Sequence, residues 1–298
     1  DVVISASGSP EAHLAARRIA RQSKAKWIAD FGDPWHFIDK VNRPKLSKRI
    51  EKLERQTVRE ADALIFTTRD TLQIYREWLG EDAPAHMAVV PYGFDRDEIK
   101  AYPVRQHASP SIQFAHVGTA HTNDRNLIPF IRALAEVQRS AEVQATGFLL
   151  AGRRSPAFDQ EVAQQNIANA ELHGKVAYQE SLRLQAESDV LIIIGNFNGS
   201  QIPGKIFICL ALELPILYVS QANPESDEAL ALLKPHQGVV IAKNDERELG
   251  MAISYIVSNI QTLKAGARER ANSKLVQEFE SRSLAATVES VILRLAEQ

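Results

Sequence analysis

The sequence predicts an α/β protein of two domains, each built on a mostly parallel sheet. Apolar runs of strand length alternate with amphipathic helical patterns along the whole chain, which is typical of β-α-β units. The length of 298 residues exceeds what one hydrophobic core usually fills. The 45% apolar and 24% charged residues are typical of a globular protein and exclude collagen-like and strongly disordered classes.

In the first half, the apolar runs predict strands at residues 2–6, 27–31, 63–67 and 88–91. Each run is short and apolar enough to be buried on both faces of a parallel sheet. Ser9, Pro10 and Glu11 predict a helix start, because serine caps a helix and proline fits its first turn. Residues 43–62 predict a longer amphipathic helix.

The first half is locally basic. Residues 14–59 contain 13 Lys or Arg against 5 Asp or Glu. Such a cluster could bind anionic lipid headgroups or phosphorylated acceptors, although an ordinary solvated helix face is the commoner explanation. No apolar run approaches the ~20 residues that span a bilayer, and the lone cysteine, Cys209, has no disulfide partner in the chain. We therefore expect a cytoplasmic protein, with peripheral contact at the inner face of an anionic membrane as a further hypothesis.

The second half restarts the alternation after residues 102–110, which carry two prolines and predict an interdomain linker with its boundary near His107. Predicted strands lie at 112–117, 147–150, 176–178, 190–194, 215–219 and 238–241. Predicted helices lie at 127–137, 158–170, 205–212 and 246–260. The sequence thus predicts domains at 1–107 and 108–280, and a C-terminal helix at 281–298 that braces their junction.

Two glycine-rich loops follow predicted strands of the second domain. In open parallel sheets, ligands bind beyond the carboxyl ends of the strands. One loop runs from Gly118 to Arg125, where glycine lets the backbone approach a ligand and arginine supplies a permanent charge. The other leads to Lys205 at a helix start, where a cation opposes the helix dipole unless an anion lies beside it. Each loop alone could be a capped turn, but together they predict one anion-binding crevice.

Several segments resemble the family 4 glycosyltransferases in order and spacing. In the second half these are residues 116–127, 202–207, which include the Pro203-Gly204-Lys205 motif, and 211–217. In the first half they are residues 9–13, 27–35 and 90–95. The resemblance implies the GT-B fold, with two Rossmann-like domains facing a cleft. It also implies an incomplete N-terminal domain, because that fold would place another strand and a glycine-bearing loop before Asp1.

The resemblance further implies a retaining transfer of a sugar from a UDP- or GDP-linked donor to a glycan or lipid-linked acceptor, in envelope polysaccharide or glycolipid biosynthesis. Arg125 and Lys205 would stabilise the diphosphate leaving group as its charge builds up. We expect no metal or other cofactor, since no acidic pair has metal-ligand spacing, and no nucleic-acid partner. The expected donor-binding residues are Gly118, Thr119, Gly152, Arg153, Gln201, Ile202, Pro203 and Gly204.

On the acceptor side, Asp33 follows a predicted strand and could hold or deprotonate an acceptor hydroxyl, or equally serve as a turn or cap. For His13 we favour a structural role on a helix face. Trp35 could stack on a sugar or belong to the core.

The sequence departs from the family pattern at three positions. Ile208 stands where the family has a glutamate that binds the donor ribose, Ser200 replaces an earlier acidic residue, and Glu213 replaces a glycine. Losing one carboxylate–ribose bond would weaken binding by roughly 1.5–3 kcal/mol. These departures motivate an alternative, a non-catalytic partner or scaffold subunit in a glycan-assembly complex. An epimerase or phosphorylase is a third option, whose acidic and cofactor-lysine signatures are not apparent.

Overall fold

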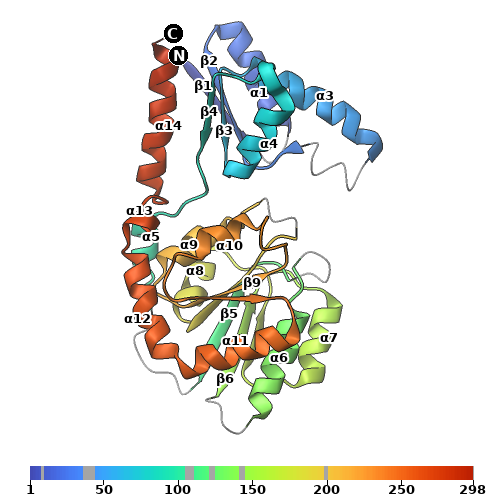
Figure 1. The fold of residues 1–298 in the computed structure, drawn as a ribbon, viewed down its shortest axis with the longest axis vertical. Coiled ribbons are helices and arrows are strands. Elements are labelled where there is room, and N and C mark those ends of the chain that lie inside the picture. Colours follow the sequence, from blue (N-terminus) through green and yellow to red (C-terminus); the bar gives the residue numbers. More distant parts are fainter. Residues whose placement is uncertain are drawn as a thin grey trace. The chain divides into compact units, whose positions relative to one another are not determined.

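The computed structural model describes residues 1–7, 10–35, 44–104, 111–120, 125–140, 145–197 and 201–297. The chain divides into two compact units, one formed by residues 1–92 and 282–298 and the other by residues 93–281 (Figure 1). Each unit is a parallel sheet with helices on both faces. The predicted α/β class is confirmed.

The first unit has a four-stranded parallel sheet of order β1-β2-β3-β4. Its strands are β1 (Val2–Ser7), β2 (Lys26–Phe31), β3 (Ala63–Phe66) and β4 (His86–Val89). One face packs against α1 (Pro10–Ser23), α3 (Pro44–Glu60) and α4 (Arg69–Leu79), which is followed by the short helix η1 (Gly80–Asp82). The other face packs against Val291 and Leu295 of α14 (Ser281–Ala296).

The second unit has a six-stranded parallel sheet of order β10-β9-β8-β5-β6-β7. Its strands are β5 (Ile112–Val117), β6 (Thr146–Ala151), β7 (Ala170–His173), β8 (Val190–Ile194), β9 (Ile216–Ser220) and β10 (Val239–Lys243). One face is covered by α6 (Ile128–Arg139), α7 (Pro156–Gln165) and α11 (Glu246–Ser258). The other is covered by α8 (Tyr178–Ala186), α9 (Lys205–Ala211) and α10 (Glu228–Leu233). The remaining helices are α5 (Arg96–Lys100), α12 (Ile260–Ala271) and α13 (Lys274–Gln277).

The units divide between Tyr92 and Gly93, whereas the sequence placed the boundary near His107, which lies outside the described residues. Residues 93–104 join the second unit because Phe94 is anchored there. Its amide donates to the Phe279 carbonyl at 3.1 Å, and its carbonyl accepts from the Ser281 amide at 2.9 Å. The C-terminal helix, expected to brace the domain junction, instead forms one layer of the first unit.

One predicted strand is wrong. Residues 176–178 are not a strand, because Tyr178 begins α8, and the strand of this region is β7. Its sequence, Ala-Glu-Leu-His, lacks the apolar run of a central strand because β7 lies at the edge of the sheet. The helix predicted at 158–170 also ends early, at Gln165, where Asn166 adopts a left-handed conformation with φ 51°. The other predicted strands coincide with observed ones, with ends shifted by two residues or fewer.

Candidate functional site

The second sheet reverses its strand order between β5 and β8. From β5 the chain runs outward through β6 and β7 on one side, then returns to build β8, β9 and β10 on the other. A crevice opens at such a switch point beyond the carboxyl ends of the strands, and ligands bind there in open α/β sheets. The two glycine-rich loops follow β5 and β8, so they begin on either side of this switch point.

Two glycines bring the backbones after β5 and β6 into contact. Gly118 has φ 152° and Gly152 has φ 153°, conformations that residues with a side chain rarely adopt. A Cβ on Gly152 would lie 1.8 Å from the Gly118 carbonyl oxygen, and one on Gly118 would lie 2.8 Å from Nζ of Lys205. Only glycine fits at either position, and the ammonium of Lys205 lies directly against Gly118.

Lys205 is the first residue of α9, and its side chain reaches the end of β5. Its Nζ donates to the Val117 carbonyl at 3.2 Å and lies 3.5 Å from both ring nitrogens of His116. His116 is fully buried in β5, with its Nδ1 3.1 Å from the Ile192 carbonyl. Within the described residues, no carboxylate forms an ion pair with Lys205.

Arg125 reaches from the loop after β5 toward the loop after β8. Its Nη2 lies 3.5 Å from Oδ1 of Asn196, which is long for a hydrogen bond. The Asn196 amide donates to the Gln201 carbonyl at 2.9 Å and so joins the two described ends of that loop. Arg125 forms no ion pair in the described part of the chain.

The two cations lie close enough to affect one another. Burial, opposed by Cys209 and reinforced by the charge of Arg125, lowers the pKa of Lys205 to about 7. Burial first, and then the charges of Lys205 and Arg125, hold the pKa of His116 well below its ordinary value. Like charges repel, so two cations held this near each other, with no ion pair to either among the described residues, would be stabilised by a bound anion.

The structure places the other expected donor residues at the same edge of the sheet. Thr119 and Arg153 follow Gly118 and Gly152, and the Arg153 carbonyl accepts from the Ala120 amide at 2.8 Å. The Arg153 side chain is exposed. The turn into α9 contains the remaining expected residues, Gln201, Ile202, Pro203 and Gly204. In this turn the Ile206 amide donates to the Pro203 carbonyl at 2.9 Å.

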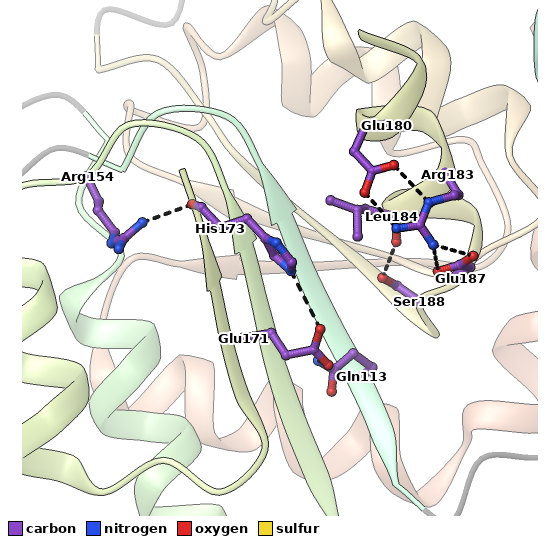
Figure 2. Close-up of polar contacts among 9 residues, drawn as sticks. All are labelled: Gln113, Arg154, Glu171, His173, Glu180, Arg183, Leu184, Glu187 and Ser188. Carbon is purple, nitrogen blue, oxygen red and sulfur yellow. Dashed lines mark hydrogen bonds and ion pairs between the residues drawn. The ribbon is translucent and has the colours of Figure 1, made fainter. Parts of the chain in front are cut away.

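A hollow elsewhere in this unit has the wrong charge for an anion. It has a volume of about 410 Å³ and lies beside α8 and β7. Figure 2 shows the polar contacts of several side chains that line it. The guanidinium of Arg183 is already held by Glu180 and Glu187, each at 2.6 Å. Glu171, which also lines the hollow, pairs with His173 at 3.6 Å. A diphosphate would meet carboxylates there.

The first unit gathers acidic groups around the predicted acceptor residue. Burial raises the pKa of Asp33, and it raises the pKa of Asp30 in β2 to about 6. The pKa of Tyr92 is raised by burial and by both carboxylates. Gly32 allows this cluster to form, since a Cβ there would lie 3.0 Å from the Tyr92 hydroxyl. Asp30 and Tyr92 were missed, although a carboxylate within an apolar strand is a signal in the sequence.

His13 and Trp35 belong to the core of the first unit. His13 is fully buried, its Nδ1 lies 2.7 Å from the Ser5 hydroxyl, and its ring stacks on Phe31 at 4.6 Å. Burial lowers the pKa of His13 to about 4. Trp35 is 6% exposed and packs in the same cluster. The structural role favoured for His13 fits these contacts, and Trp35 presents no open face to a sugar.

Within the described residues, no group of three or more His, Cys, Asp or Glu is arranged to hold a metal ion. None of the helices in the same part of the chain has the length and apolar character required to cross a bilayer.

No family model and no curated protein matches the sequence, but solved structures match over nearly the whole chain. Sucrose-phosphate synthase from Thermosynechococcus elongatus has 14% identity and a TM-score of 0.68, covering 99% of this chain and 74% of that one. HepE of Anabaena, solved with UDP, has 13% identity and a TM-score of 0.74, covering 99% and 79%. WaaG, a glycosyltransferase involved in lipopolysaccharide biosynthesis, has 12% identity and a TM-score of 0.66, covering 93% and 83%.

At these identities the similarity establishes the fold and not the activity. The chain is a GT-B-type α/β protein with two Rossmann-like domains, and the predicted fold class is confirmed. Structures of UDP-N-acetylglucosamine 2-epimerases also match this chain, so proteins with this fold catalyse more than one reaction.

Proposed function

We propose that this chain is a glycosyltransferase of the family 4 type, which binds the diphosphate of a nucleotide-sugar between Arg125 and Lys205. The observation that carries the proposal is that Lys205 lies against Gly118 and within electrostatic reach of Arg125, and that neither cation forms an ion pair in the described chain. The site lies at the switch point of the sheet, where ligands bind in open α/β folds.

The two cations would act mainly in the transition state. As the bond between sugar and diphosphate breaks, negative charge builds up on the diphosphate oxygens, and fixed positive groups stabilise that charge more than the ground state. This electrostatic role makes a metal ion unnecessary, and we propose a metal-independent, retaining transfer. Asp33, together with Asp30 and Tyr92, would hold the acceptor hydroxyl.

A UDP-linked donor is the first choice, with GDP as the alternative. HepE has been solved with UDP and with UDP-glucose, and it shares the fold of this chain. Gly118 and Gly152 let the backbones after β5 and β6 approach each other beside Lys205, and Thr119 and Arg153 follow them in the chain.

The acceptor would be a glycan or a lipid-linked sugar of the cell envelope. WaaG, which shares this fold, acts in lipopolysaccharide biosynthesis. In the first unit, α3 exposes Lys48, Arg49 and Lys52, which would attract anionic headgroups. We therefore propose a cytoplasmic protein that contacts the inner face of the membrane through this helix.

Calorimetric titration with UDP and GDP tests donor binding. The wild type should bind one of them with a Kd below about 1 mM, and Arg125→Ala and Lys205→Met should each weaken binding at least tenfold. Arg139→Ala is the matched control, because Arg139 lies at the far end of α6 and pairs only with Glu136 in the described chain. The absence of binding heat with either nucleotide would contradict the proposal.

A non-catalytic partner is the second candidate, favoured by one observation. Ile208 is half-buried against the apolar layer that contains α9, so the position of the family's ribose-binding carboxylate is apolar. Such a protein would bind nucleotide weakly and would associate with another subunit that has an intact donor site. Donor turnover by the purified chain, measured as release of UDP, separates the two candidates.

A further inference from the structure

Four residues around the anion site form a relay of amide hydrogen bonds. Asn244 follows β10, and its Nδ2 donates to the Asn126 carbonyl at 2.8 Å and to Oε1 of Gln221 at 3.0 Å. Gln221 follows β9, and its Nε2 donates to the Gly195 carbonyl at 2.8 Å. The relay therefore connects the ends of β8, β9 and β10 with the start of α6.

The two ends of this relay lie next to residues of the candidate site. Asn126 is the neighbour of Arg125 in the chain, and its Oδ1 accepts from the amide of Ile128, the first residue of α6, at 3.0 Å. Gly195 is the neighbour of Asn196, whose Oδ1 lies 3.5 Å from Nη2 of Arg125. The hydrogen bonds, these two peptide links and this longer contact close a ring that includes Arg125.

The orientation of Asn244 is fixed by its partners. Its amide nitrogen faces two acceptors, Asn126 and Gln221, so a flipped side chain would direct its oxygen at both. In this orientation, Oδ1 of Asn244 is buried and has no hydrogen-bond partner among the described residues. A buried acceptor that is left unsatisfied costs folding free energy. Stability alone therefore explains poorly why an asparagine stands at position 244. A role in positioning Arg125 explains it better.

We propose that Asn244 is a positioning residue, which holds Arg125 over the diphosphate site through Asn126 and through Gln221. The inference rests on the proposed function, because the ligand in question is the diphosphate of the donor. The side chain of Asn244 donates to Asn126 and Gln221, and the proposed effect on the ligand passes from them to Arg125.

The Asn244→Leu variant, which keeps the volume but removes both donors, provides the test. Hydrogen exchange of residues 126–134 should accelerate in the free protein, and UDP affinity should fall about tenfold. In the presence of Arg125→Ala, Asn244→Leu should cause no further loss of UDP affinity, because the two changes act through the same guanidinium. Gln221→Met should likewise accelerate the hydrogen exchange of residues 126–134 and lower UDP affinity. If Asn244→Leu does not fold, Gln221→Met tests the proposal in its place.

Gln138→Leu is the matched control. Gln138 bridges backbone groups at the other end of the same sheet, donating to the Thr146 carbonyl at 2.9 Å and accepting from the Ala168 amide at 3.0 Å. It should lower stability but leave UDP affinity unchanged. Any one of three outcomes would overturn the proposal. Asn244→Leu could leave the hydrogen exchange of residues 126–134 unchanged, it could leave UDP affinity unchanged, or the losses of UDP affinity could add in the double variant. A wild type that binds no nucleotide would refute the proposed function instead, and the exchange measurement would still decide whether Asn244 positions Arg125.

Discussion

Nζ of Lys205 lies 3.5 Å from each ring nitrogen of His116 at the end of β5. Because burial holds the pKa of His116 well below its ordinary value, the ring is neutral near pH 7 and adds no charge. The pKa of Lys205, at about 7, then determines the charge of this corner of the site. Bound diphosphate would favour the ammonium form, so ligand binding and protonation of Lys205 are coupled.

This coupling predicts that UDP affinity falls as the pH rises above about 7, because the free protein must then take up a proton to bind. The loss should approach tenfold per pH unit. Calorimetry between pH 7.5 and 9, in two buffers of different ionisation enthalpy, measures the proton uptake directly. In this range the terminal phosphate, with a pKa of about 6, stays ionised. Lys205→Arg is the control: it keeps the charge and should abolish the pH dependence, and an unchanged slope would contradict the coupling.

The glycine pair predicts a local steric effect. Gly152→Ala places a methyl group 1.8 Å from the Gly118 carbonyl, and Gly118→Ala places one 2.8 Å from Nζ of Lys205, both at positive φ. Each should destabilise the fold by about 1–3 kcal/mol and weaken UDP binding at least tenfold. Gly174→Ala is the control, because no atom lies within 4 Å of a Cβ there. Thermal melts and nucleotide titrations of the three variants check this, and equal behaviour of all three would refute it.

The sequence predicted the fold well where burial imposes a pattern. The central strands β5 and β8 are continuous apolar runs, and their predicted ends match the structure. The edge strand β7 was not predicted, because its residues are partly or fully exposed and form no continuous apolar run. The unit boundary was also misplaced, since it depends on the contacts of Phe94 with residues 279–281, and no local pattern encodes a contact so distant in the chain.

For the site, the sequence supplied the charged residues but not what surrounds them. Arg125 and Lys205 stood out because glycine-rich loops precede them. Asn244 and Gln221 could not be recognised, because an amide after a strand is common and only the spatial order of the strands brings these two together. Arg270, far from any motif, likewise gains its role only from packing.

Near the end of α9 the family pattern has a glycine, whereas this chain has Glu213. We expect Arg270 to satisfy the backbone carbonyls at this helix end in place of a glycine cap. Its buried guanidinium donates to backbone carbonyls at and beyond the end of α9, where no glycine cap exists; they belong to Cys209, Leu210, Leu212 and Leu214. It also donates to the carbonyls of Gln237 and Gly238, which precede β10. Arg270→Met would leave these acceptors buried and unsatisfied, and should destabilise the fold by about 3–5 kcal/mol. Urea unfolding measures the loss. Arg268→Met on the exposed side of α12 is the control and should change stability by less than about 0.5 kcal/mol.

Asp30 is predicted to reduce stability at neutral pH. Burial raises its pKa in the folded state to about 6, above its ordinary value of 3.8. Between these values the folded state binds more protons than the unfolded state, so stability falls as the pH rises and the full cost is present above pH 6. Asp30→Asn should therefore stabilise the protein by about 1–3 kcal/mol at pH 7.5 and leave it unchanged at pH 4.

The same substitution should lower sugar transfer. Asp30 acts electrostatically on Tyr92, as Asp33 does, and a carboxylate retained at a cost in stability is typical of a functional position. Melting temperatures at pH 4 and pH 7.5 give the first outcome, and the rate of UDP release with a saturating acceptor gives the second. If Asp30→Asn is more stable at neutral pH but transfers sugar at the wild-type rate, the Asp30 carboxylate only destabilises the fold. Asp33 alone would then bind the acceptor. If both change, Asp30 belongs to the acceptor site.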